Sequence, residues 1–158
     1  MPRADLVIEA SRAVVDGEER PCAVVVEAGR VVAVDDPAPG RAAGAAAEVV
    51  RLDEDVVLLP GLVDTHVHVN EPGRAEWEGF AHATRAAAEG GVTTIVDMPL
   101  NSIPPTLDAD ALAVKRAAAQ GQCAVDVGFW GGAVPGNADE LRPRWDAGVF
   151  GFKCFLLH

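Results

Sequence analysis

Two histidines placed two residues apart, His66 and His68, are the side chains of this sequence best suited to chemistry. They close the apolar segment Leu59-Pro-Gly-Leu-Val-Asp-Thr-His66-Val-His68. Successive side chains of a strand point to opposite faces, so both imidazoles would project from one face. Such a pair forms half of a metal site or serves a purely structural role. Asp64 falls on the same face, where it would orient a ring or pack beneath it.

The second unusual residue is Lys153, one of two lysines in the chain, which lies inside the apolar run Val149-Phe-Gly-Phe-Lys-Cys-Phe-Leu-Leu157. An ammonium group in such a run is costly unless it is paired, neutralised or chemically changed. Its side chain could reach solvent from a strand end, form a Schiff base, or be carboxylated by carbon dioxide to bridge two divalent ions. Only the third interpretation also accounts for the two histidines.

Length and charge limit the class of protein. The chain has 158 residues, 49% of them hydrophobic, which is enough for an ordinary folded domain. Its formal charge of -11, with no cationic cluster, disfavours nucleic-acid binding. We find neither a signal peptide nor an apolar run that could span a bilayer, so we expect a cytoplasmic protein without a membrane partner.

The first 55 residues are rich in short β-type runs separated by turn signals. Strands are expected at residues 6–9, 12–15, 23–27, 31–34 and 48–52, the first four forming an antiparallel meander. We therefore predict a small β-sandwich-type domain over residues 1–55 and a second domain over residues 56–158.

Strands alternate with helices after residue 55. The strands are expected at 56–63, 92–97, 123–128 and 150–156, and the first helix at 75–89. The second helix would begin at a Thr106 cap and bury Leu107, Ala111, Val114 and Ala118. Asn137 and Glu140 resemble a capping box that opens a third.

Nearly apolar strands joined by helices indicate a parallel sheet covered by helices. Polar side chains gather where these strands end, as at the reactive face of a (β/α)₈ barrel. Because a complete barrel takes roughly 250 residues, the predicted fold class is α/β, with the N-terminal half of a TIM-type barrel after the small β domain.

Several stretches resemble the amidohydrolase superfamily and, within it, the allantoinases, relatives of dihydroorotases and hydantoinases. The clearest are Pro60-Gly-Leu-Val-Asp-Thr-His-Val-His-Val-Asn-Glu-Pro-Gly73 and Gly148-Val-Phe-Gly-Phe-Lys-Cys-Phe155, with further matches at 76–80, 90–106 and 129–132. The early meander also resembles the small β domain of this family. The resemblance is to the N-terminal portion only.

The resemblance implies a site with two divalent metal ions, zinc first, with cobalt, manganese or iron as alternatives. His66 and His68 match paired ligands of the more buried ion, and Lys153 matches a carboxylated lysine that bridges both ions. The other histidine ligands and a catalytic aspartate come from later strands and have no match here. We therefore expect the chain alone to be inactive and to bind metal weakly.

Two asparagines match positions near the substrate. Dihydroorotases carry an arginine where Asn70 stands, to grip a carboxylate, so Asn70 suits uncharged allantoin better. Asn101 matches a substrate-side asparagine, although it could equally form a turn.

The resemblance implies hydrolysis of the cyclic amide of allantoin to allantoate, with a homo-oligomer expected for the full-length form. A hydantoinase, dihydropyrimidinase or dihydroorotase is the alternative within the same chemistry. A non-catalytic scaffold is the alternative of another class.

Overall fold

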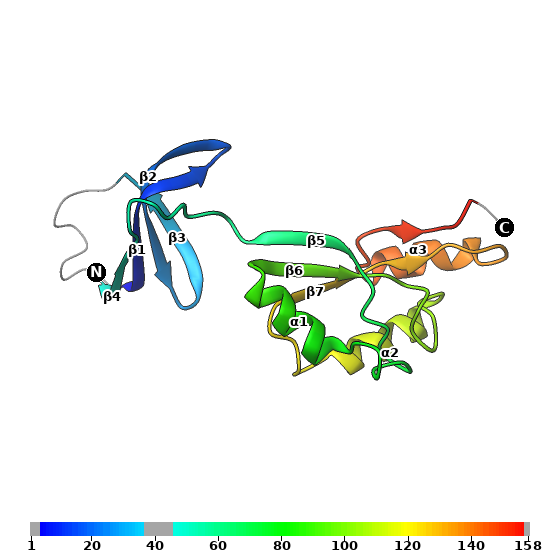
Figure 1. The fold of residues 1–158 in the computed structure, drawn as a ribbon. Coiled ribbons are helices and arrows are strands. Elements are labelled where there is room, and N and C mark those ends of the chain that lie inside the picture. The colour runs from blue at the N-terminus through cyan, green and yellow to red at the C-terminus, as the bar shows by residue number, and fades with distance from the viewer. Residues whose placement is uncertain (1–3, 37–45, 157–158) are drawn as a thin grey trace. The chain divides into compact units, whose positions relative to one another are not determined.

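The computed structural model describes residues 4–36 and 46–156, and the chain divides into two compact units, Met1–Pro60 and Gly61–His158 (Figure 1). This division lies a few residues beyond the boundary expected after Asp55. The reason is that Leu58 still bonds to the first unit: its N–H donates to the Arg12 carbonyl at 2.9 Å, and its carbonyl accepts from the Val14 N–H at 2.9 Å. The segment expected to open the second unit's first strand therefore belongs partly to the first unit.

The first unit is a four-stranded sheet in the order β3-β2-β1-β4. Its strands are β1 (Ala4–Val15), β2 (Glu18–Glu27), β3 (Arg30–Asp35) and β4 (Ala46–Arg51). The first three form an antiparallel meander, as the turn signals predicted, and β4 runs parallel to β1. The two short strands expected within residues 6–15 are one strand with an irregularity between Ala10 and Ala13.

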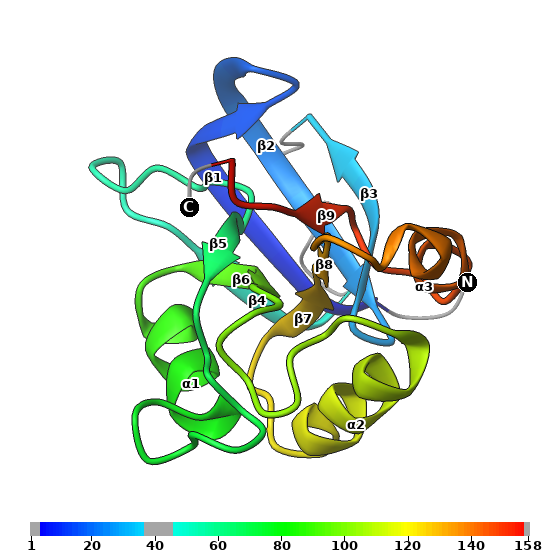
Figure 2. The same cartoon turned by 90° about the vertical axis from the view of Figure 1, so that its right-hand side faces the viewer.

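The second unit contains three parallel strands in chain order and a separate parallel pair. The three are β5 (Leu62–Val67), β6 (Val92–Asp97) and β7 (Asp126–Phe129), and the pair is β8 (Gly131–Gly132) and β9 (Phe152–Lys153). The helices are α1 (Phe80–Glu89), α2 (Ala109–Ala119), the 3₁₀ turn η1 (Ala138–Glu140) and α3 (Leu141–Asp146). Figure 2 shows α1 and α2 beside the strands β5 to β7.

The core of this unit forms where these helices meet the sheet. Phe80 of α1, Ile95 of β6, Leu112 of α2 and Phe129 of β7 belong to one buried cluster. The rings of Phe80 and Phe129 meet edge to face with centroids 6.2 Å apart, a favoured aromatic geometry. Burial of these large side chains fixes one face of each strand, and so determines which residues face the other way.

Predictions about the second helix and the third were wrong in detail. Thr106 does not cap α2; the carboxylate of Asp108 accepts the Ala111 N–H at 2.7 Å instead. Val114 is 48% exposed, and the buried positions are Ala111, Leu112, Lys115 and Ala119. Asn137 makes no capping bond; it accepts from the Val134 N–H and donates to the carbonyls of Leu107 and Gly132.

Strand β5 is exposed over most of its length. Leu62 is 54% exposed and Val63 61% exposed, and within residues 4–36 and 46–156 β5 pairs with β6 alone. An exposed apolar strand at a sheet edge favours association with other chains. Among the described residues, no helix has the length and apolarity needed to cross a bilayer.

Candidate functional site

The two histidines project from the face of the sheet opposite the helices. Val67 and Val69 pack against the helix-side core, and alternation then directs His66 and His68 to the other face. Their ring centroids are 5.4 Å apart, and both side chains are exposed. Two accessible imidazoles at this separation can bind the same ligand.

The backbone on both sides of His68 is bonded to the end of β6. The Met98 N–H donates to the Val67 carbonyl at 2.8 Å, and the Val69 N–H donates to Oδ1 of Asp97 at 2.8 Å. Asp97 and Val69 are both fully buried. The position of His68 is therefore set by a buried carboxylate as well as by the sheet.

A buried ion pair holds that carboxylate. Nζ of Lys115 donates to Oδ2 of Asp97 at 2.7 Å and to the Met98 carbonyl at 2.9 Å, and both side chains are 1% exposed. Burial raises the pKa of Asp97 against the opposing attraction of Lys115, and burial lowers the pKa of Lys115. The other lysine of the chain thus holds, at the end of β6, the carboxylate that bonds to the backbone next to His68. The sequence alone did not indicate this role.

The strand around His66 is irregular. Pairing of β5 with β6 shifts between Asp64 and Val67, so Thr65 and His66 have no partner in the ladder. Oδ1 of Asp64 accepts the backbone N–H of His66 at 2.9 Å. Asp64 therefore fixes the main chain at His66, whereas we had expected it to orient a ring; irregularities of this kind often redirect side chains at functional sites.

The two asparagines have different surroundings. Oδ1 of Asn101 lies 3.1 Å from Nδ1 of His68, so the structure brings Asn101 to the histidine pair. Asn70 has a positive φ of 66°, and its Oδ1 is buried without a hydrogen-bond partner. Asn70 therefore retains an unused acceptor two residues after His68.

Lys153 lies on the same face of its strand pair as the histidines do on theirs. Phe152 packs against the helix-side core, which directs its neighbour Lys153 away from the helices. Lys153 is partly exposed, and Nζ lies 5.5 Å from the centroid of the Phe155 ring. Within the described residues, no three histidine, cysteine, aspartate or glutamate side chains cluster as a metal site.

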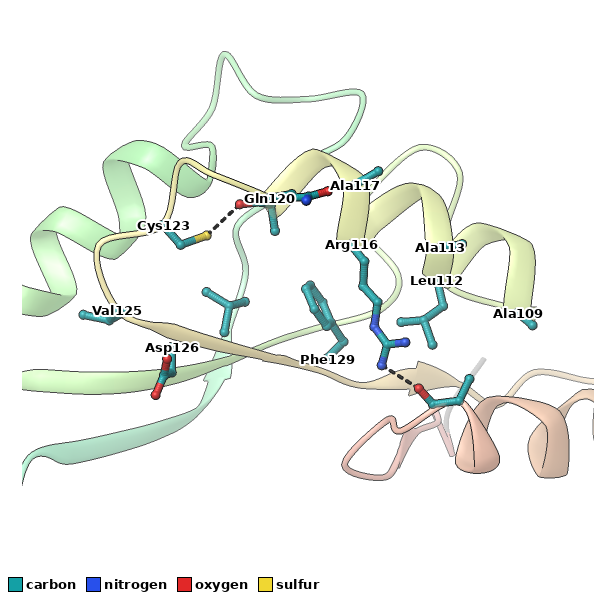
Figure 3. Close-up of a pocket in the computed structure, with 13 residues that line it drawn as sticks. Ala109, Leu112, Ala113, Arg116, Ala117, Gln120, Cys123, Val125, Asp126 and Phe129 are labelled. Carbon is teal, nitrogen blue, oxygen red and sulfur yellow. Dashed lines mark hydrogen bonds between the residues drawn. The ribbon is translucent and has the colours of Figure 1, made fainter. Parts of the chain in front are cut away.

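A groove between α2 and β7 lies on the helix side, away from these residues (Figure 3). The guanidinium of Arg116 crosses toward α3 and donates to the Ala147 carbonyl at 2.6 Å. The Cys123 thiol donates to the Ala119 carbonyl, and burial raises its pKa. Alanine side chains form much of the groove wall, and the raised pKa disfavours the thiolate form of Cys123 that would bind a metal.

Comparison with known proteins places these features in a family. The model of the amidohydrolase family matches residues 57–155. The chain is 55% identical to the allantoinase of Streptomyces avermitilis over 158 residues, covering 99% of this chain and 34% of that protein. It is 46% identical to the allantoinase of Saccharomyces cerevisiae, covering 95% of this chain and 34% of that protein.

Solved structures give the same result. The L-hydantoinase of Arthrobacter aurescens superimposes with a TM-score of 0.84 at 31% identity, covering 94% of this chain and 32% of that one. The chain spans about a third of the length of the relatives that it matches. The solved hydantoinases that this chain resembles have the TIM-barrel amidohydrolase fold, so the predicted fold class and the predicted resemblance are confirmed.

Proposed function

Because this chain belongs to the amidohydrolase family, we propose that it supplies the first ligands of a metal centre that hydrolyses allantoin to allantoate. The observation that carries the proposal is the histidine pair: His66 and His68 lie together on the helix-free face, with ring centroids 5.4 Å apart. Lys153 of β9 also points away from the helices, and in carboxylated form it is the third proposed ligand. The 46–55% identity to allantoinases favours allantoin as the substrate.

The donor set fits the metal ions that are general in this family, whose allantoinases and hydantoinases are binuclear metal enzymes. Neutral imidazoles and a carbamate oxygen suit zinc, cobalt, manganese or iron, and we propose zinc. Bound there, divalent ions supply activation of a water molecule and polarisation of the amide carbonyl. The remaining ligands and the catalytic base would come from outside the described residues.

The residues around the pair support this assignment. With Oδ1 of Asn101 accepting from Nδ1 of His68, the Nε2 lone pair of His68 stays free for an ion. The buried, unpartnered Oδ1 of Asn70 can accept a hydrogen bond from a ureido or ring N–H. An arginine at this position would instead favour a substrate carboxylate.

Further proposals accompany this assignment. We propose a cytoplasmic location, a homo-oligomeric full-length form, and residues 1–55 and 56–158 as the family's small β domain and the first half of its barrel. The alternative of a hydantoinase is supported by the structural likeness to L-hydantoinase. Substrate choice is therefore the point that an experiment has to decide.

A chimera tests the proposal. Residues 1–158 would replace the matched third of the Streptomyces avermitilis allantoinase, and the product would be assayed on allantoin, hydantoin and dihydroorotate. We expect allantoin turnover, abolished by His66→Asn or Lys153→Ala. His82→Asn is the matched control, since His82 is an exposed histidine that pairs with Glu78 on the surface. A folded chimera that opens hydantoin and leaves allantoin intact would refute the assignment.

A further inference from the structure

Trp130 reaches from the end of β7 to the histidine strand. Its indole Nε1 donates to the Thr65 carbonyl at 2.8 Å. Strands β5 and β7 pair with opposite edges of β6, so the indole has to cross β6 to make this bond. Thr65 directly precedes His66 and lies in the irregular part of β5, where the ladder gives it no partner.

The main chain and the alternation of side chains fix the face on which the indole lies. The Trp130 N–H donates to the Asp97 carbonyl at 3.0 Å, which anchors the residue beside β6. Phe129 packs among the helix-side core residues, so Trp130 points to the opposite face. This is the face of His66 and His68.

The other side of the indole abuts the chain that leads to Lys153. A Cβ atom added at Gly151 would lie 2.4 Å from Cζ3 of Trp130, which is a steric clash. The Gly151 carbonyl is held in place because it accepts the Gly131 N–H at 2.9 Å. Gly151 lies two residues before Lys153, on the same face of the chain.

We propose that Trp130 is a positioning residue that sets the separation between the histidine pair and Lys153. One rigid ring bonds to Thr65, the residue before His66, on one side and lies against Gly151, two residues before Lys153, on the other. Two strand ends that share no ladder are thereby spaced by a side chain with only two rotatable bonds. The metal-binding consequence rests on the proposed function; the spacing itself rests on the contacts alone.

Fluorescence of the 158-residue chain tests whether Trp130 borders the metal site. The chain has three tryptophans, and Trp77 and Trp145 are 62% and 55% exposed. With both of these replaced by phenylalanine, Trp130 is the only indole, and Co²⁺ bound at the histidines should quench its emission. A chain that keeps only Trp145 is the control and should stay bright. His66→Asn with His68→Asn should remove the quenching.

Zinc affinity tests whether the indole positions the ligands. Trp130→Phe keeps an aromatic ring and removes the N–H, and we expect zinc to bind roughly 10–100-fold more weakly, as for other residues that orient metal ligands. Trp145→Phe is the control, with unchanged affinity. Thermal unfolding of each variant separates a loss of folded protein from a loss of site geometry.

A double-mutant cycle isolates the contact with Gly151. Gly151→Ala should weaken zinc binding in the wild-type background and have little effect beside Trp130→Ala, because the clash needs the indole. Zinc affinity that is unchanged in Trp130→Phe, or cobalt that fails to quench Trp130, would overturn the proposal. An inactive chimera with these effects intact would count against the allantoinase assignment and leave the role of Trp130 standing.

Discussion

Each half of the proposed site lies near a buried cation, and the two cations have different kinds of partner. At the end of β6, next to the histidine pair, Lys115 pairs with the carboxylate of Asp97. Behind the Lys153 strand, Arg144 is fully buried, and its hydrogen bonds to the part of the chain that the structure describes go to carbonyl oxygens, those of Glu140, Thr106 and Gly132.

Arg144 has no counter-ion among these partners. Its Nη2 is buried without a hydrogen-bond partner, its guanidinium carbon lies 5.2 Å from the centroid of the Phe152 ring, and burial lowers its pKa. The histidine end therefore depends on one hydrogen-bonded pair of opposite charges. The Lys153 end depends on hydrogen bonds to neutral acceptors, with the carboxylates of Glu140 and Asp108 attracting Arg144 from a greater distance. Removing one partner should lower the free energy of unfolding most where the remaining partner is a buried charge.

The largest effect is expected from Lys115→Met, which leaves the Asp97 carboxylate buried and unpaired. Breaking a buried pair from one side costs about 3–5 kcal/mol. Urea unfolding followed by circular dichroism would measure it. Lys115→Met combined with Asp97→Asn should recover most of the loss, since the amide oxygen of the introduced asparagine can still accept the Val69 N–H. If the double variant were as unstable as the single one, the unpaired charge of Asp97 would not be the cause of the loss.

Arg144→Met should cost less than Lys115→Met. It removes one donor each from the carbonyls of Thr106 and Gly132, which keep the Gly132 N–H and the Asn137 amide as donors. For these lost charged hydrogen bonds we expect a loss of about 1.5–3 kcal/mol in the free energy of unfolding, partly offset because a buried charge disappears. The same urea titration provides the value. If Arg144→Met proved the more damaging of the two, the contrast between paired and unpaired cations would be wrong.

Arg116→Ala probes a link between the two regions. Arg116 follows Lys115 on α2, and its bond to the Ala147 carbonyl joins that helix to the end of α3, the helix that carries Arg144 (Figure 3). Because this bond is exposed, we expect a loss of about 0.5–1.5 kcal/mol. Hydrogen exchange at the Val149 amide, which donates to the Arg144 carbonyl, should quicken; unchanged exchange there would mean that the link carries no coupling.

The smallest effect on stability is expected at the exposed ion pair of Arg12 and Glu19, which serves as a reference for the buried groups. The hydrogen bond and charge of Arg12 hold the pKa of Glu19 below its ordinary value of 4.5. A lowered folded-state pKa gives stability above the unfolded-state pKa, and this stability is lost as pH falls through the folded-state value. Glu19→Gln should therefore differ from wild type near neutrality and converge with it in acid, as amide exchange in β1 and β2 would report.

The alternation of strands and helices was sufficient to predict the fold class, because buried parallel strands leave continuous apolar runs. The strand expected at 92–97 matches β6 residue for residue. The strand expected at 150–156 is the shorter β9, Phe152–Lys153, because the apolar run includes residues that stay exposed, such as Phe155 and Leu156. An apolar run therefore predicts a strand's presence better than its length.

The candidate ligands were predictable and their supports were not. His66, His68 and Lys153 stand out because their chemistry conflicts with their apolar surroundings. Lys115 was missed because a lysine on a helix is normally read as a surface residue, although it is one of only two in the chain. Trp130 bonds to Thr65, a residue 65 positions away, and a contact between such distant segments leaves no periodic signal.

The close approach of Gly151 to Trp130 has an evolutionary consequence. Any side chain at position 151 and an indole at position 130 exclude each other, because the extra carbon would lie 2.4 Å from the ring. Homologous chains that keep the tryptophan should therefore keep the glycine, and those that lose the tryptophan are free to vary at both sites. The two positions should covary as a pair across an alignment, independently of how either varies with the metal ligands.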